Sequence, residues 1–400
     1  MKVVIAPDSF KESLAASDVA AALAEGVLST CPSAVIDVCP MADGGEGTAA
    51  AMLAALGGEW VHADVYNALG SQLRARFAML ATPQRAVLPG EVGISAARAR
   101  ATGEGEIAGR TAVLDMAAAS GLAGVPRELR DPHRSTTFGT GQLIAAAIDA
   151  GAREIIVALG GSATVDGGAG CAQGLGAEFY DDAGEPIVCG IANADLEHLA
   201  RIDLTGLDPR LGEVTLRAAC DVTNPLLGDR GAAAVFGPQK GATPEGVVSL
   251  EKNLAKLAAI VNEQFDVDLT AMTGGGAAGG LGAGLAGLLG ASLENGAALV
   301  AGTVDLAGRL RGADLCLTGE GCFDASTAYG KAPLAVAEDA RIAGVPCVCI
   351  PGTAQPDAPT DAFADVLPLV AGEVSARAAM EQPELFLRRR AAEAMRRWKS

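Results

Sequence analysis

Residues 2–58 carry the alternation of segments that indicates the fold class. They read KVVIAPDSF (2–10), KES (11–13), LAASDVAAALAEGV (14–27), then, after a short break, VIDVCPM (35–41) and ADGGEGTAAAMLAALGG (42–58). Val19, Leu23 and Val27 are spaced along one face of a helix. A strand, a helix, a strand and a helix in this order predict a parallel sheet covered by helices. The opening is a strand rather than a signal peptide.

Both ends of the chain contribute to this predicted sheet. Strand-like runs occur in the middle of the chain at 61–66, 73–80, 85–89, 112–116, 154–159 and 215–220, and near its end at 314–317 and 346–350. The short central runs, which are separated by turns, are typical of an antiparallel or mixed sheet. We therefore expect an α/β protein with two α/β domains. Residues 1–65 and 290–400 form a Rossmann-like domain with a parallel sheet, and residues 66–289 form an inserted domain with a mixed sheet.

The net charge of −18 limits the partners of this chain. Such a surface repels phosphate backbones, so we expect no nucleic-acid partner. Anionic small molecules would be repelled too, unless the few cations gather at their site. The positions of the seven lysines are therefore informative: Lys2, Lys11, Lys240, Lys252, Lys256, Lys331 and Lys399.

Cysteine, histidine and glycine usage indicates a cytoplasmic protein. The nine cysteines form no CxxC pair, which favours buried reduced thiols, and the three histidines lack zinc-site spacing. The uncharged stretch 269–293 is long enough to span a membrane, but its nine glycines favour tight packing in a globular protein.

The basic end 383–400 is open to two interpretations, an anionic partner or a C-terminal helix whose Leu385, Phe386, Met395 and Trp398 pack inward. We favour the helix, and we expect no membrane partner.

Five loops combine glycine with Ser, Thr or Asp, namely 8–11, 42–48, 160–170, 273–284 and 318–321. Loops at the carboxyl ends of parallel strands form the ligand crevice of α/β sheets, and glycines let the backbone approach phosphate oxygens. No segment matches GxxxxGK[ST] or the dinucleotide GxGxxG pattern. Each loop alone is also compatible with a purely structural turn, so the prediction of a phosphate site depends on their coincidence.

The loops also contain carboxylates and lysines, the side chains that phosphoryl transfer commonly uses. The carboxylates at or just beyond strand ends are Asp8, Asp43, Glu46, Asp166, Asp221, Glu320 and Asp324. Phosphoryl transfer needs a carboxylate for Mg²⁺ and often another for the attacking hydroxyl, although any one of these residues could instead be a helix cap or an Asx turn. Lys11, Lys240 and Lys331 lie in loop motifs, where they would contact an anion or form a structural salt bridge.

Nine segments in fixed order resemble the bacterial glycerate kinase family, of the type that forms 2-phosphoglycerate. They are APDSFKESL, CPMADGGEGT, LDMAAASGL, STTFGTGQLI, ALGGSATVDGGAG, ACDVTNPLLG, AAVFGPQKGAT, GGGAAGGLGAGL and LTGEGCFD…GKAP, and they extend from residue 2 to about residue 355. The resemblance implies two α/β domains with the active site in the cleft between them, and ATP with Mg²⁺ as co-substrates. The sequence departs from the family motifs at Glu12, at Val165 and in the segment 322–327, and the last departure removes donors expected near an anionic ligand.

The matching motifs imply the residues of this cleft, to which we assign roles from chemistry. We predict four catalytic residues: Asp8, Lys11, Asp166 and Lys331. The predicted glycerate site comprises Ser9, Asp43, Gly44, Gly45, Glu46, Asp221 and Asn224. The predicted nucleotide site comprises Gly160, Gly161, Ser162, Thr164, Gly319, Glu320 and Gly321. Asp324 and Glu320 are the predicted Mg²⁺ ligands.

The predicted reaction transfers the γ-phosphoryl group of ATP to the 2-hydroxyl of D-glycerate. A kinase of a related hydroxy acid and a non-catalytic metabolite-binding protein are the alternatives. The latter gives no reason for Asp8, Lys11, Asp166 and Lys331 to occur together. The sequence leaves open whether the chain forms a homo-oligomer.

Overall fold

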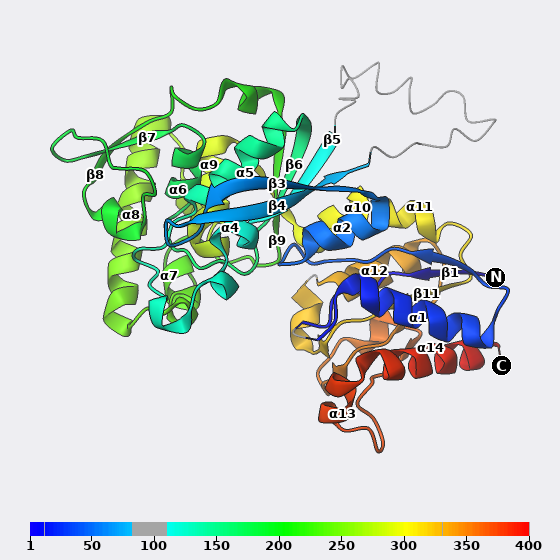
Figure 1. Ribbon diagram of the computed structural model, residues 1–400. Helices are drawn as coiled ribbons and strands as arrows, with labels where there is room; N and C mark the ends of the chain where they lie inside the picture. The colour runs from blue at the N-terminus through cyan, green and yellow to red at the C-terminus, as the bar shows by residue number, and fades with distance from the viewer. Residues whose placement is uncertain (12, 82–109, 330, 400) are drawn as a thin grey trace.

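Two β-sheets organise the molecule, one in each of two lobes (Figure 1). The computed structural model describes residues 1–11, 13–81, 110–329 and 331–399. The first sheet is entirely parallel, with strand order β15-β13-β11-β1-β2. Its strands come from both ends of the chain: β1 (Lys2–Ile5), β2 (Val35–Val38), β11 (Leu315–Thr318), β13 (Cys347–Cys349) and β15 (Asp365–Val366).

The second sheet is mixed, with strand order β10-β9-β6-β5-β4-β3. Strand β4 is antiparallel to both of its neighbours, β3 and β5. From β5 onward the pairs β5–β6, β6–β9 and β9–β10 are parallel. Its strands are β3 (Gly58–Tyr66), β4 (Gln72–Leu80), β5 (Arg110–Asp115), β6 (Ala152–Ala158), β9 (Thr215–Cys220) and β10 (Ser292–Asn295). Two short ribbons accompany the sheets, formed by β7 (Glu178–Asp181) with β8 (Leu199–Asp203) and by β12 (Cys322–Phe323) with β14 (Thr353–Ala354). The strand expected at 85–89 lies outside the described residues.

Helices cover both sheets. Those that pack with the parallel sheet or between the lobes are α1 (Ala16–Thr30), α2 (Thr48–Leu56), α10 (Gly296–Thr303), α11 (Leu306–Leu310), α12 (Ala332–Ile342), α13 (Ala376–Glu381) and α14 (Pro383–Lys399). The helices of the other lobe are α4 (Ala117–Ser120), α5 (Phe138–Asp149), α6 (Ala169–Gly174), α7 (Ala232–Phe236), α8 (Pro244–Phe265) and α9 (Leu281–Leu289).

The predicted α/β fold with one parallel and one mixed sheet is therefore confirmed. Sheet membership changes near residues 57 and 296, because β3 and β10 both pair within the mixed sheet. The domain boundaries near residues 65 and 290 stay a prediction. The short apolar runs in both regions suit either sheet, so periodicity alone could not assign them.

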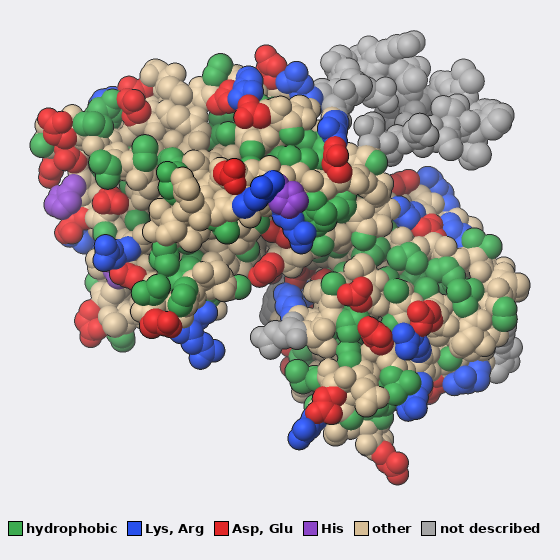
Figure 2. Space-filling model, in the orientation of Figure 1, with side chains coloured by type: hydrophobic (Ala, Val, Ile, Leu, Met, Phe, Trp, Pro, Cys, Tyr) green, Lys and Arg blue, Asp and Glu red, His purple; other side chains and the backbone are tan. Residues whose placement is uncertain are grey.

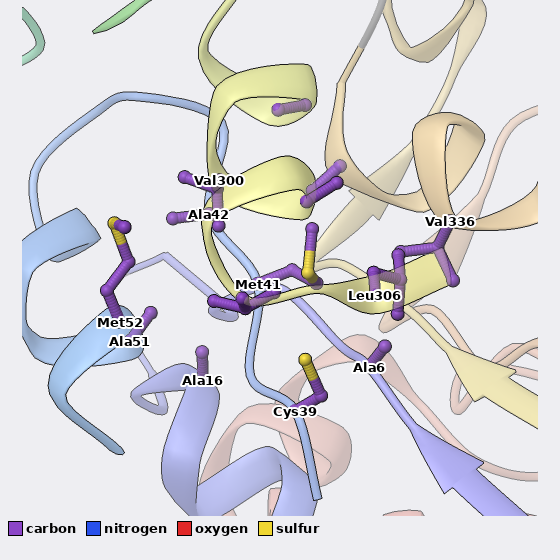
Figure 3. Packing of buried hydrophobic residues seen from close by; sticks show 14 of the residues in the cluster. Ala6, Ala16, Cys39, Met41, Ala42, Ala51, Met52, Val300, Leu306 and Val336 are labelled. Carbon is purple, nitrogen blue, oxygen red and sulfur yellow. The ribbon is translucent and has the colours of Figure 1, made fainter. Parts of the chain in front are cut away.

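One hydrophobic core cluster joins the two lobes. It includes Val4 of β1 and Ile156 of β6, both fully buried, and the residues drawn in Figure 3. Of the residues labelled there, Met41 lies on the loop after β2, Met52 on α2 and Val300 on α10. Close packing of this kind resists displacement, so it fixes the two sheets relative to each other. The loops at the ends of the strands in one sheet are therefore held in fixed positions relative to those of the other sheet.

The C-terminal helix α14 packs along α1, as expected for a structural helix (Figure 1). Its Leu387 and Met395 are fully buried, and Arg388 forms an ion pair with Glu25 of α1. The expectation for Trp398 is wrong, since this side chain is 45% exposed on the last turn of the helix. Within the described residues, no helix has both the length and the apolar character needed to cross a membrane.

Candidate active site

The order of the parallel strands determines where a ligand crevice forms. After β1 the chain continues to β2 on one side, and after β11 it continues to β13 on the other side. Neighbouring strands whose connections diverge in this way define a switch point, and ligands of α/β sheets bind outside the carboxyl ends of such strands. The two loops at this point touch, because the Asp8 N–H donates to the Gly319 carbonyl at 2.8 Å.

A cavity of about 320 Å³, which we name the switch-point cavity, opens at this position. Its polar floor is formed by loops that follow β1, β2 and β11. The predicted site residues among its lining are Asp8, Ser9, Lys11, Asp43, Glu320, Gly321 and Lys331. The sequence prediction therefore named most of the polar residues that the fold gathers here.

Carboxylates in the floor of this cavity carry perturbed pKa values. Burial and, to a smaller extent, the neighbouring charge of Asp43 together raise the pKa of Asp8 to about 7. Burial also raises the pKa of Glu320, which accepts a hydrogen bond from Thr327 Oγ1 at 2.6 Å. Desolvation and like charge both disfavour the ionised form of a carboxyl group. The floor thus concentrates negative charge, which a bound cation would relieve.

Two lysines balance part of that charge. Lys11 Nζ lies 3.3 Å from Asp43 Oδ2, and Lys331 Nζ lies 3.6 Å from Glu320 Oε2. The Lys11 side chain is 68% exposed, whereas its partner carboxylate is buried. Partly exposed lysines beside a cavity are able to turn toward an anion that enters it.

Loops of the mixed sheet face the same crevice. The parallel strands β6 and β9 end shortly before Gly160 and Asp221, and both residues line a second cavity of about 650 Å³. We name it the inter-sheet cavity, because the loops after β1 and β2 contribute Ser9, Lys11 and Glu46 to it. The surface is hollowed where the two lobes meet (Figure 2).

Two contacts hold the loops of the two sheets together. A Cβ atom on Gly160 would lie 2.5 Å from the Cα atom of Gly45, so only glycine permits this approach. Asp115, at the end of β5, accepts hydrogen bonds from the N–H groups of Gly47 at 2.9 Å and Ala49 at 3.0 Å. Burial raises the pKa of Asp115 to about 6. Asp115 was not among the residues predicted from the sequence, although it lies at a strand end like the other carboxylates.

Several predicted site residues lie outside both cavities. They are Gly44, Ser162, Thr164, Asp166, Asn224, Gly319 and Asp324. Asn224 Nδ2 donates to the Arg230 carbonyl at 2.8 Å, and Asp324 Oδ1 accepts from the Ser326 N–H at 2.8 Å. The second contact is the Asx turn considered as the alternative for this carboxylate.

Asp166 is fully buried beneath the loop that follows β6. Its Oδ2 accepts hydrogen bonds from the N–H and the hydroxyl of Thr137, both at 2.7 Å, and its Oδ1 accepts from the Gly168 N–H at 3.1 Å. Lys240, also buried, donates to Ser162 Oγ at 2.7 Å and to the Thr164 carbonyl at 2.8 Å. Asp166 and Lys240 thus support the 160–168 loop from the interior.

The donors at the floor of the switch-point cavity fit Mg²⁺. This ion prefers oxygen ligands and is commonly held by one or two carboxylates together with substrate phosphates. Asp8 and Glu320 line one cavity and influence each other electrostatically, whereas Asp324 lies outside it. Across the described chain, no group of three or more His, Cys, Asp or Glu side chains is arranged to hold a metal ion. Phosphate oxygens of a substrate would therefore have to complete the coordination.

The fold and this site define an α/β enzyme whose crevice presents lysines and buried carboxylates to small anionic ligands. Comparison with known proteins identifies the family. The model of the glycerate kinase family matches residues 3–399, and the chain therefore belongs to this family.

Relatives of known sequence and structure agree with this membership. The chain is 44% identical over 357 residues to glycerate 2-kinase of Escherichia coli K12, covering 89% of this chain and 86% of that protein. It is 43% identical over 357 residues to glycerate kinase of Bacillus subtilis 168, with the same coverage. A crystal structure from Salmonella typhimurium LT2, assigned as glycerate kinase 2, is similar with a TM-score of 0.82 and 40% identity, covering 100% of this chain and 98% of that one. The resemblance that the sequence motifs indicated is confirmed.

Proposed function

We propose that the protein is a glycerate 2-kinase, which converts ATP and D-glycerate to ADP and 2-phosphoglycerate. One observation carries this proposal: Ser9 and Lys11 line both the switch-point cavity and the inter-sheet cavity. Two ligands bound in these cavities would meet at this loop, as a phosphoryl donor and its acceptor must. The name of the Escherichia coli relative supports the position of the product phosphate.

Asp8 is the proposed acceptor of the hydroxyl proton. In the reaction the 2-hydroxyl oxygen forms a bond to the γ-phosphorus, and the bond from that phosphorus to the β,γ-bridging oxygen breaks. A general base works best when its pKa lies near the working pH. The pKa of Asp8, about 7, meets this condition. Asp166, which the sequence also indicated as catalytic, is not suited to this role, because its carboxylate is occupied by backbone and hydroxyl donors in the interior.

Lys11 and Lys331 are proposed to stabilise the transferring phosphoryl group. Phosphoryl transfer depends mainly on positioning and on charge stabilisation, and both lysines border the switch-point cavity. Mg²⁺, held by Glu320 together with phosphate oxygens of ATP, would supply further positive charge to the transferring group. Gly321 adds no side chain to the lining, so phosphate oxygens would be able to approach its backbone.

The inter-sheet cavity suits glycerate. Glu46 and Asp221 provide acceptors for its two hydroxyls, and Lys11 provides a cation for its carboxylate. Binding the carboxylate fixes the adjacent carbon and therefore the 2-hydroxyl, which is the more hindered of the two. Correct placement of reacting groups is able to outweigh such a difference in intrinsic reactivity.

The product is tested by coupling the reaction to enolase without added mutase. We expect phosphoenolpyruvate to appear at once, because enolase acts on 2-phosphoglycerate. A signal that needs mutase would identify 3-phosphoglycerate and refute the proposed regiochemistry. Loss of glycerate-stimulated ADP release on chelation of the metal is the matching test for Mg²⁺.

A kinase of a related small hydroxy acid is the alternative, motivated by the departures from the family motifs at Glu12, Val165 and the segment 322–327. Comparing ADP release with D-glycerate, L-glycerate, tartronate and lactate decides between the two. A higher kcat/KM for any acid other than glycerate would favour the alternative. A cytoplasmic location stays a prediction.

A further inference from the structure

The switch-point cavity has a second side that the phosphoryl chemistry does not need. Besides the charged residues, its lining includes an apolar set, which we name the apolar wall: Phe10, Leu369, Val370, Ala376, Ala379 and Met380. Phe10, Leu369 and Ala379 are buried, whereas Met380 is 63% exposed at the rim. The cavity therefore offers a hydrophobic surface and a charged surface to one ligand.

The apolar wall is held in place by regular structure. The Leu369 N–H donates to the Pro351 carbonyl at 2.8 Å, and the Val370 N–H donates to the Gly352 carbonyl at 3.0 Å. These bonds extend the parallel pairing of β13 and β15 beyond the ends of the two strands. The wall is thus preformed on the edge of the sheet.

Helix α13 completes the wall from the C-terminal part of the chain. Ser375 caps its first turn by accepting from the Ala378 N–H at 3.2 Å. Ala379 belongs to the same core cluster as Leu387 and Met395 of α14, so the inner face of α13 is anchored. The exposed side chain of Met380 remains at the opening of the cavity.

Only one substrate of the proposed reaction matches this combination of surfaces. Glycerate has three carbons bearing a carboxylate and two hydroxyls, and therefore has no apolar face to bury. A nucleotide has a flat, largely apolar base at one end and phosphates at the other. Small-molecule sites commonly have volumes of roughly 300 to 1,000 Å³, apolar walls and a few placed polar groups. The cavity, of about 320 Å³, lies within that range.

We propose that the wall formed by Phe10, Leu369, Val370 and α13 binds the nucleoside part of ATP. The phosphates then extend along the floor to Lys331 and Lys11, and glycerate occupies the inter-sheet cavity. This inference rests on the proposed function. It assigns a nucleoside subsite to α13, a segment that no sequence motif indicated.

The test substitutes the exposed rim of the wall. Met380→Asp places a charge where the base would lie, and Ile342→Asp, at the end of α12, is the matched control. Both residues are exposed hydrophobic side chains in the same lobe, at 63% and 71%. Neither supports the core, so both variants are expected to fold. The measurements are the KM values for ATP and glycerate, and the affinity for ADP by calorimetry without glycerate.

We expect Met380→Asp to raise the KM for ATP and the Kd for ADP by roughly fivefold to tenfold, since apolar contact is lost and a charge is desolvated. The KM for glycerate should change less than twofold, and Ile342→Asp should behave as the wild type. Adenosine alone should compete with ATP in the wild type. A rise in the KM for glycerate with unchanged ADP affinity, or no change in either, would overturn the assignment. If glycerate does not stimulate ATP consumption, the proposed function fails, and the ADP affinities still decide the nucleoside subsite.

Discussion

Replacing Lys240 with methionine should remove a pH dependence from the stability of the folded chain. Lys240 is 2% exposed and donates to Ser162 Oγ and the Thr164 carbonyl. Burial lowers its pKa from 10.5 to about 7, and the nearby charge of Asp166 offsets part of that effect. Between these two pH values the unfolded chain binds a proton that the native chain does not. The free energy of unfolding therefore rises with pH in that window.

The size of the effect follows from this difference in pKa. Each pH unit in the window contributes about 1.4 kcal/mol, so the gain between pH 7 and pH 9 is roughly 2 kcal/mol. Buried thiols such as Cys39, whose pKa is raised to about 12 by burial, work in the opposite direction above their ordinary pKa. Because they are common to both proteins, the difference between wild type and Lys240→Met isolates the lysine.

The assay is urea unfolding at pH 7, 8 and 9 for the wild type, Lys240→Met and Lys252→Met. Lys252 is the control, since its side chain is 72% exposed and paired with Glu197 on the surface. Relative to the variant, the wild type should gain roughly 2 kcal/mol across the series, while the control follows the wild type. Curves of wild type and Lys240→Met that stay parallel from pH 7 to 9 would refute the reasoning.

Three further predictions concern the site. Lys331→Met should lower kcat/KM at least about tenfold, equivalent to about 1.4 kcal/mol of transition-state stabilisation. The surface substitution Lys256→Met is the control and should leave kcat/KM unchanged. Equal activity of the two variants would make Lys331 structural. The pKa of Asp8 is raised to about 7 by burial and by a neighbouring carboxylate, so kcat/KM should increase with pH up to about 7 and then level off. A rise in kcat/KM centred below pH 5 would contradict the role of Asp8 as base. Gly160→Ala should lower the melting temperature and reduce kcat/KM at least about tenfold, because the new Cβ atom would lie 2.5 Å from Gly45 Cα. Unchanged kinetics would show that the two loops are able to separate.

Much of the fold and part of the site could be predicted from the sequence. The strand-and-helix alternation at the start of the chain determined the parallel sheet, because side-chain periodicity is a local property. Glycine, carboxylate and lysine residues at strand ends indicated Asp8, Lys11, Glu320 and Lys331, and these residues do line one cavity. Ordered motifs along the whole chain indicated the family, which the family model confirms.

Only the tertiary structure decided how the remaining residues are used. Asp166 and Lys240 lie in the same kind of loop as Asp8 and Lys331, yet they are buried beneath their loop rather than exposed to a cavity. The distinction depends on which side of the loop meets solvent, which is set by packing between distant segments and leaves no local pattern. The same holds for the wall formed by α13, whose residues join loops more than 300 positions earlier in the chain. Pairing of strands from both ends of the chain brings these segments together, and no local sequence pattern predicts that contact.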